Sequence, residues 1–193
     1  MATQETKKIK EKIIDDNLKF RADNEKKGEI MINDTFDEHT MEYVFNRLKS
    51  MALESHIKNI TIYINSSGGM VNALYPIMDM INYIGKHIST VVLGKAYSCG
   101  AMLLLSGHKG GRFAHEHSSI LLHEVAAEIK GKTSQVRIDV KDLDDTNKEF
   151  KKIIKAKTKM TKEQIDMYMD SNLDIFITAQ QALKFGIIDK IIK

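Results

Sequence analysis

Gly94-Lys95-Ala96-Tyr97-Ser98-Cys99-Gly100-Ala101 is the stretch from which the fold can be worked out. Residues 87–93 before it are β-branched and apolar and predict a buried strand, and residues 101–105 after it predict a short apolar helix that Gly107 ends. Ser98 would then lie at the corner between strand and helix. There its hydroxyl projects from the backbone, and the N–H of Cys99 points from a helix N-terminus toward a developing oxyanion. A serine that only caps the helix fits the same position, so both interpretations stay open.

The composition limits the class of protein. The chain has 193 residues, of which 42% are hydrophobic and 28% charged, and this predicts a soluble globular protein with a substantial core. The net charge of +3 is too small to indicate a nucleic-acid partner. A single cysteine excludes an intramolecular disulfide and favours a reducing compartment. No apolar run is long enough to cross a membrane, and residues 1–20 are too charged for a signal peptide, so we expect a cytoplasmic protein with no membrane partner.

The domain organisation follows from changes in pattern along the chain. Residues 1–27 contain a narrow apolar stripe among charged residues, which predicts an N-terminal arm or an amphipathic helix. Strands and helices alternate within residues 28–193, and this is typical of a single α/β domain with parallel crossovers. Residues 134–157 predict a long polar helix that cannot be buried throughout. The seven lysines between Lys148 and Lys162 fit a solvated helix face better than a phosphate-binding patch.

A serine nucleophile needs a base, an acid that orients the base, and two donors for the oxyanion. His123 ends the apolar run 120–122, and a strand there would carry its side chain to the carboxyl edge of the sheet, where active sites collect. A structural histidine fits that position equally well. His115 and His117 have strand spacing on one face, but no third ligand accompanies them, so no metal is expected. The acid cannot be chosen from the residues alone, because several aspartates follow His123.

The second oxyanion donor has a candidate in Gly68-Gly69. The pair follows the predicted strand 59–65, and glycines allow backbone amides to come close to a substrate oxygen. A plain tight turn explains the same two residues.

Five blocks of this sequence, in order and at matching spacing from about residue 29 to 190, closely resemble the proteolytic subunit of Clp protease, the ClpP family. The blocks are Ile64-Asn65-Ser66-Ser67-Gly68-Gly69, Gly94-x-Ala96-x-Ser98-x-Gly100-Ala101, Gly107-x-Lys109-Gly110-x-Arg112-Phe113, Leu122-His123, and Asp174-x-Phe176-x-Thr178-Ala179 with Ala182-x-x-Phe185-Gly186-Ile187-Ile188-Asp189. The resemblance implies that Ser98 is the nucleophile, His123 the general base and Asp174 the orienting acid. It also implies an oxyanion hole formed by the amides of Gly69 and Cys99, with Gly68 shaping the turn.

The resemblance further implies a crotonase-like stack of ββα units with a protruding handle helix, at about residues 134–157. Subunits of the family form seven-membered rings that pair face to face around a chamber. Unfolded polypeptides would be the substrates, a Clp-type AAA+ unfoldase a possible partner, and no cofactor or metal is expected. The function implied is that of a serine endopeptidase.

This sequence departs from the family pattern in three places. Ser67 stands where the family usually has proline. Glu124-Val125-Ala126-Ala127-Glu128 replaces the usual Gln-Pro and glycines of a strand that pairs with substrate, so Glu124 places an acid beside His123. The first thirty residues do not resemble the segment that helps to engage the unfoldase, which leaves that partnership open.

Three other functions compete with the protease. An α/β-hydrolase esterase would need a histidine after its acid, and none follows Asp174. A crotonase-like acyl-CoA enzyme would share the fold but would not need Ser98. A catalytically inactive or ATPase-independent ring subunit is the remaining alternative.

Overall fold

The computed structural model describes residue 7, residue 23 and residues 26–193. The expected N-terminal arm or amphipathic helix therefore lies almost wholly outside the described residues. The boundary between that arm and a single following domain stays a prediction.

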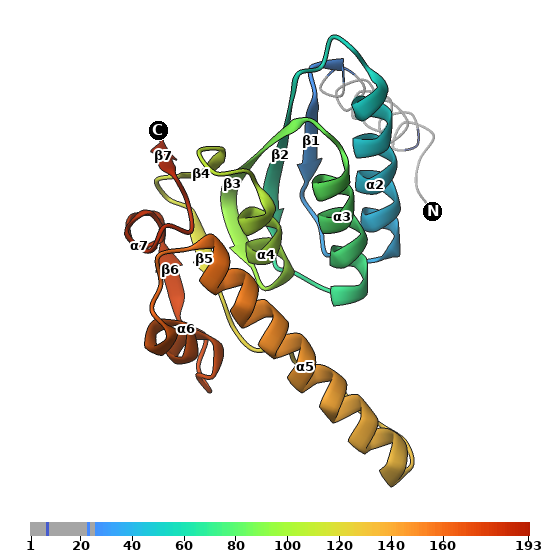
Figure 1. Cartoon of the computed structure of the whole chain (residues 1–193), viewed down its shortest axis with the longest axis vertical. Helices are drawn as coiled ribbons and strands as arrows, with labels where there is room; N and C mark the ends of the chain where they lie inside the picture. The colour runs from blue at the N-terminus through green and yellow to red at the C-terminus, as the bar shows by residue number, and fades with distance from the viewer. Residues whose placement is uncertain (1–6, 8–22, 24–25) are drawn as a thin grey trace.

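A parallel sheet organises the chain, with strand order β1-β2-β3-β4-β7 (Figure 1). β5 pairs in parallel with the far end of β3, and β6 pairs with β5 in the antiparallel sense. This confirms the predicted α/β class with parallel crossovers. The strands are β1 (Glu29–Ile32), β2 (Asn59–Ser66), β3 (His87–Tyr97), β4 (Arg112–His115), β5 (Ser119–Leu121), β6 (Phe176–Thr178) and β7 (Lys190–Ile192).

Three of the described helices begin at a side-chain cap. Thr161 and Thr178 each form a capping box with the glutamine three residues later, and Gly186 adopts the left-handed conformation (φ 70°) that ends the last helix. Asp37 caps the first described long helix by accepting from the N–H of Thr40. The helices are α2 (Glu38–Leu53), α3 (Val71–Tyr83), α4 (Cys99–Ser106), α5 (Thr133–Lys157), α6 (Lys162–Met169) and α7 (Ala179–Phe185). Every residue of α4 is buried, so this helix is the centre of the core.

Pro76 lies further into its helix than expected. A proline is ordinarily tolerated only in the first turn of a helix, because it lacks an N–H and clashes further in, yet Pro76 is the sixth residue of α3. The carbonyl that loses its partner belongs to Asn72, which is exposed and can be solvated.

β3 continues to Tyr97, so the predicted end of that strand at residue 93 is wrong. The strand changes partner along its length: Thr90–Val92 pair with β4, and Lys95–Tyr97 pair with β5. Gly94, with φ 88°, lies between the two regions. The extra residues are extended because β5, which is distant in sequence, supplies their hydrogen bonds.

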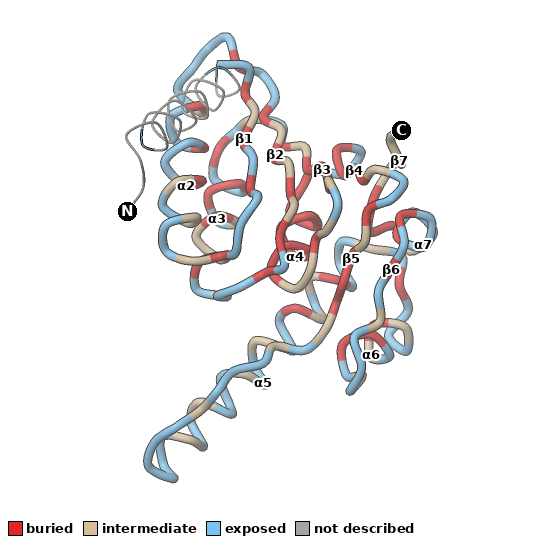
Figure 2. Tube along the Cα trace, turned by 180° about the vertical axis from the view of Figure 1, so that it is seen from behind, coloured by how far each residue is buried: buried red, intermediate tan, exposed pale blue. Residues whose placement is uncertain are grey.

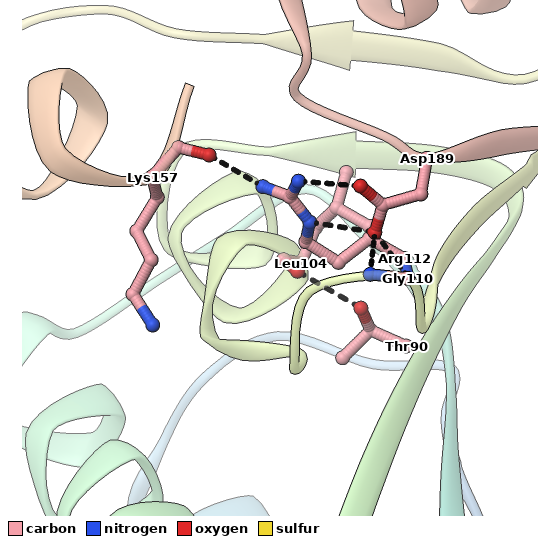
Figure 3. A network of polar contacts seen from close by, with 6 residues as sticks. All are labelled: Thr90, Leu104, Gly110, Arg112, Lys157 and Asp189. Atoms are coloured by element: carbon pink, nitrogen blue, oxygen red, sulfur yellow. Dashed lines mark hydrogen bonds and ion pairs between the residues drawn. The ribbon is translucent and has the colours of Figure 1, made fainter. Parts of the chain in front are cut away.

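Arg112 and Asp189 tie the end of the chain to the sheet (Figure 3). Nε and Nη2 of Arg112 donate to the two carboxylate oxygens of Asp189 at 3.0 and 2.7 Å, and Nη1 donates to the carbonyl of Lys157, the last residue of α5, at 2.6 Å. The N–H of Gly110 also donates to Asp189, at 2.8 Å. Burial opposes ionisation of Asp189, but the Arg112 hydrogen bonds and charge outweigh it and hold the pKa of this carboxyl below its ordinary value.

α5 confirms the predicted long polar helix. At 25 residues it is about 37 Å long and extends beyond the rest of the domain (Figure 1). Only Phe150 and Ile154 are buried, both near its C-terminal end, and the protruding part is largely exposed in Figure 2. Among the described residues, no helix is long and apolar enough to cross a membrane.

Candidate active site

Ser98 is the one described residue other than glycine with a positive φ (φ 53°, ψ −121°). Such a conformation costs about 1–3 kcal/mol and is typical of functional sites. Ser98 stands immediately before α4, but its side chain makes no capping hydrogen bond. Its N–H donates to the carbonyl of Leu121 on β5 at 3.0 Å, which fixes the sharp turn from strand to helix. Ser98 therefore occupies the N-cap position, but its hydroxyl does not make the capping hydrogen bond that the alternative interpretation needs.

Gly68 packs directly against this corner. A Cβ at Gly68 would lie 2.6 Å from Cβ of Ser98, 2.8 Å from the carbonyl oxygen of Tyr97 and 3.2 Å from the amide nitrogen of Cys99. Gly68 and Gly69 have φ values of 97° and 146°, which other residues rarely adopt. The β2–α3 turn and the start of α4 are thus in contact, as the oxyanion-hole prediction requires.

Segment 33–36 holds the glycine turn from one side, and sequence reasoning did not identify this role. The Gly68 carbonyl accepts from the N–H of Phe36 and from Oγ1 of Thr35, both at 2.8 Å, and the N–H of Met70 donates to the Phe36 carbonyl at 2.7 Å. No local sequence signal points to the segment, because its contacts span more than thirty residues.

Cys99 combines a proposed backbone donor with a thiol that is unsuited to be a nucleophile. Its amide is the first N–H of α4, and such groups have no acceptor within the helix. Its side chain is fully buried, and this burial raises the pKa of the thiol to about 11. Sγ donates to the Gly69 carbonyl at 3.2 Å, which attaches the glycine turn to α4. The adjacent hydroxyl of Ser98 is half-buried and so more accessible than the thiol.

His123 and Asp174 reach the same edge through strand pairing. In the antiparallel β5–β6 pair, Leu121 is opposite Phe176. His123 and Asp174 lie just beyond the paired residues, His123 two positions after Leu121 and Asp174 two positions before Phe176. Tyr97, the residue before Ser98, is paired with Leu121. The backbone thus brings the ends of three elements together.

The three side chains themselves are not linked. In residues 26–193, no hydrogen bond or ion pair joins Ser98, His123 and Asp174 to one another. His123 is half-buried and Asp174 is exposed. The roles assigned to the three residues therefore stay predictions.

The segment that follows His123 is attached to the handle helix. Residues 122–132 form no helix or strand, and most of them are exposed, Glu124 included. Within the segment, the N–H of Val125 donates to Oδ1 of Asn147 on α5 at 2.6 Å. Asn147 is a second residue that sequence reasoning missed, since nothing in a polar helix indicates which side chain turns back to a loop.

In the part of the chain that the structure describes, no group of three or more His, Cys, Asp or Glu side chains gathers in a way that could hold a metal ion.

The family model described as Clp protease matches residues 15–193, and the chain belongs to this family, as the resemblance predicted. Among its relatives is the ATP-dependent Clp protease proteolytic subunit of Porphyromonas gingivalis, 34% identical over 164 residues that cover 85% of this chain and 73% of the relative. Another is the ATP-dependent Clp protease proteolytic subunit 1 of Bacillus cereus, 34% identical over 164 residues that cover 85% of this chain and 84% of the relative. The chain is thus an enzyme of the Clp protease class.

Proposed function

We propose that this chain is a serine endopeptidase that cleaves unfolded polypeptides inside an oligomeric chamber. Ser98 is the nucleophile, His123 the general base and Asp174 the acid that orients it. The observation that carries the proposal is the backbone of Ser98, which is strained and leaves the hydroxyl free of any capping role. A serine held at a strained strand-to-helix turn is the arrangement by which α/β enzymes expose a nucleophile.

The proposed reaction has two halves. Neutral His123 takes the proton from Oγ of Ser98 as Oγ attacks the substrate carbonyl carbon, and the amides of Gly69 and Cys99 donate to the oxyanion. His123 then gives the proton to the leaving amine, the peptide C–N bond breaks, and an ester remains on Ser98. A water molecule, deprotonated by His123, releases the acid product by the reverse sequence. Asp174 accepts from the imidazole and fixes its tautomer.

We also propose assembly into the double seven-membered ring through α5. The helix separates its charges: residues 133–146 contain two basic and four acidic residues, and residues 147–157 contain five lysines and one glutamate. Four of these lysines, with Lys162 and Asp166 of α6, line a groove of about 600 Å³ between the two helices. An antiparallel α5 from a second copy would set its acidic half against this basic half, as a two-fold interface requires.

The charge pattern makes assembly sensitive to salt. Raising the salt concentration from about 0.1 M to about 1 M shortens the screening length from about 10 Å to about 3 Å. We expect ring pairs to separate over this range in sedimentation velocity. A particle mass that does not change over the range would contradict charge-driven pairing of α5.

An unfoldase partner is supported only by the relatives, both of which are named ATP-dependent. The test is degradation of a folded tagged protein by this chain with and without a Clp-type AAA+ unfoldase and ATP. Degradation only in the presence of both supports the partnership. Equal degradation of an unfolded substrate without them supports the ATPase-independent alternative.

The central experiment labels the purified, sized protein with a fluorophosphonate and reads the adduct by intact mass. We expect one adduct on the wild type and on Ser50→Ala, an exposed serine on α2, and none on Ser98→Ala. Asp174→Asn should label about 10⁴-fold more slowly, the loss seen when a triad aspartate is changed to asparagine. An assembled wild type without any adduct would refute the mechanism and favour the inactive ring subunit. Acyl-CoA turnover that survives Ser98→Ala would favour the crotonase-like alternative.

A further inference from the structure

Lys95 makes a contact that reaches between two elements of the proposed active site. Its ammonium nitrogen donates to Oγ of Ser67 at 2.7 Å, although the two residues are 28 positions apart. Ser67 directly precedes Gly68 and Gly69, and Lys95 lies three residues before Ser98. The contact joins the strand that ends at the nucleophile to the turn that carries a proposed oxyanion donor.

The Lys95 side chain has aromatic neighbours on one face of the sheet. Ala96 is fully buried on the core side, so Lys95 and Tyr97 share the opposite face of β3. Nζ of Lys95 is 5.9 Å from the centre of the Tyr97 ring, which is within the range of a cation–π contact. The Tyr97 ring meets Phe176 edge-on, with centroids 5.3 Å apart. The Tyr97 ring, itself packed against Phe176, limits where the ammonium group can lie, which favours a defined contact with Ser67.

The turn at Gly68 and Gly69 is held by more contacts on one side than on the other. Segment 33–36 holds the carbonyl of Gly68, and the Cys99 thiol donates to the carbonyl of Gly69. Ser67 is exposed, and within residues 26–193 its hydroxyl bonds only to Lys95. Two successive glycines leave the backbone at this point with unusual conformational freedom. The Lys95 contact therefore adds a side-chain restraint on the side of the turn that faces β3, next to the backbone pairing of Ser66 with Ala96.

We propose that Lys95 is a positioning residue which, through Ser67, keeps the Gly69 N–H directed at the oxyanion. The proposal rests on the serine protease mechanism above. Lys95 performs the task that a proline at position 67 would perform by fixing φ of the turn. Because it acts on a donor that matters most in the transition state, its loss lowers kcat and leaves KM unchanged.

The test compares rates of fluorophosphonate labelling and peptide hydrolysis in the full chain. Lys95→Met and Ser67→Ala should each slow labelling about tenfold, and the double variant should lose no more than either single variant. Lys95→Arg and Lys95→Gln keep a donor and should retain most of the wild-type rate. Lys109→Met serves as the matched control, because Lys109 is exposed, makes no hydrogen bond or ion pair in the described structure and lies outside the proposed site.

Rescue separates a positioning role from a general loss of stability. Ser67→Pro added to Lys95→Met should restore the labelling rate, because the proline ring restrains the same turn. If Lys95→Met and Ser67→Ala both label at the wild-type rate, the proposed role of Lys95 is overturned. The serine mechanism would still stand, because the wild type labels at Ser98. Slow labelling of Lys95→Gln together with wild-type labelling of Ser67→Ala would also overturn the proposal, because the rate would then depend on the charge of Lys95 and not on its contact with Ser67. A wild type that does not label at all is a failure of the proposed function itself.

Discussion

Gly68→Ala adds one methyl group at the closest contact between the glycine turn and the nucleophile. The new Cβ would lie 2.6 Å from Cβ of Ser98 and 2.8 Å from the carbonyl oxygen of Tyr97. Ordinary contact begins at 3.4 Å, so the turn and the corner must separate by about 0.8 Å. Both neighbours are fixed to the backbone and cannot rotate away.

The expected loss of folding stability in Gly68→Ala has two parts. An alanine at positive φ costs about 1–2 kcal/mol wherever it occurs. The forced separation adds about 1–3 kcal/mol of overpacking. A displacement close to 1 Å at a catalytic centre lowers the rate by about 100-fold. We therefore expect Gly68→Ala to remain folded at low temperature and to label with fluorophosphonate about 100-fold more slowly than the wild type.

Gly110→Ala is the matched control. Gly110 has a similar φ of 86°, but a Cβ there would meet nothing within 4 Å. It should therefore show the cost of positive φ in urea unfolding and should label at the wild-type rate. If Gly68→Ala labels within about threefold of Gly110→Ala, the contact between the glycine turn and the nucleophile does not control the labelling rate.

Three further predictions concern other contacts. Asp189→Asn should lower the free energy of unfolding by about 3 kcal/mol in urea titrations, because Arg112 is left buried without its counter-charge. Since the pKa of Asp189 is lowered in the native state, the stabilisation is present above about pH 4 and is lost as the pH falls through the native value, so wild type and Asp189→Asn should converge in acid. Cys99 should resist iodoacetamide at about pH 8 in the native protein and react fully in denaturant, because its pKa of about 11 keeps it protonated; rapid native alkylation would contradict this. Asn147→Ala should raise KM for long peptides severalfold while leaving fluorophosphonate labelling unchanged, because only the Val125 segment loses its tether; equal KM values would count against a role in substrate binding.

The elements of the fold were largely predictable because their signals are local. The capping boxes at Thr161 and Thr178 and the left-handed Gly186 depend on side chains within a few residues of each helix end. The end of β3 was not predictable in the same way. Residues 95–97 are extended because β5 pairs with them, and nothing in the sequence near Gly94 indicates that pairing.

The candidate site likewise contains residues that the local sequence identified and residues that it did not. Ser98 and His123 follow runs that read as strands, so the residues themselves marked them as candidates. Asp174 was identified only through the family resemblance, because its place near the end of β5 depends on the antiparallel β5–β6 register. Lys95 was not identified as a partner of Ser67, since an isolated lysine in a strand usually points to solvent.

Periodicity, caps and glycines, all read over a few neighbouring residues, were enough to predict the α/β class, the long polar α5 and a strand-to-helix corner at Ser98. Three features depended on contacts between residues far apart in the chain: the tether of Gly68 to segment 33–36, the Arg112–Asp189 pair and the Lys95–Ser67 contact. The physical reason is that a side chain's nearest partner across a sheet is chosen by register and packing, which act only once the whole sheet has formed. The sequence specifies the chemical groups, and the register and packing of the folded sheet determine which of them come into contact.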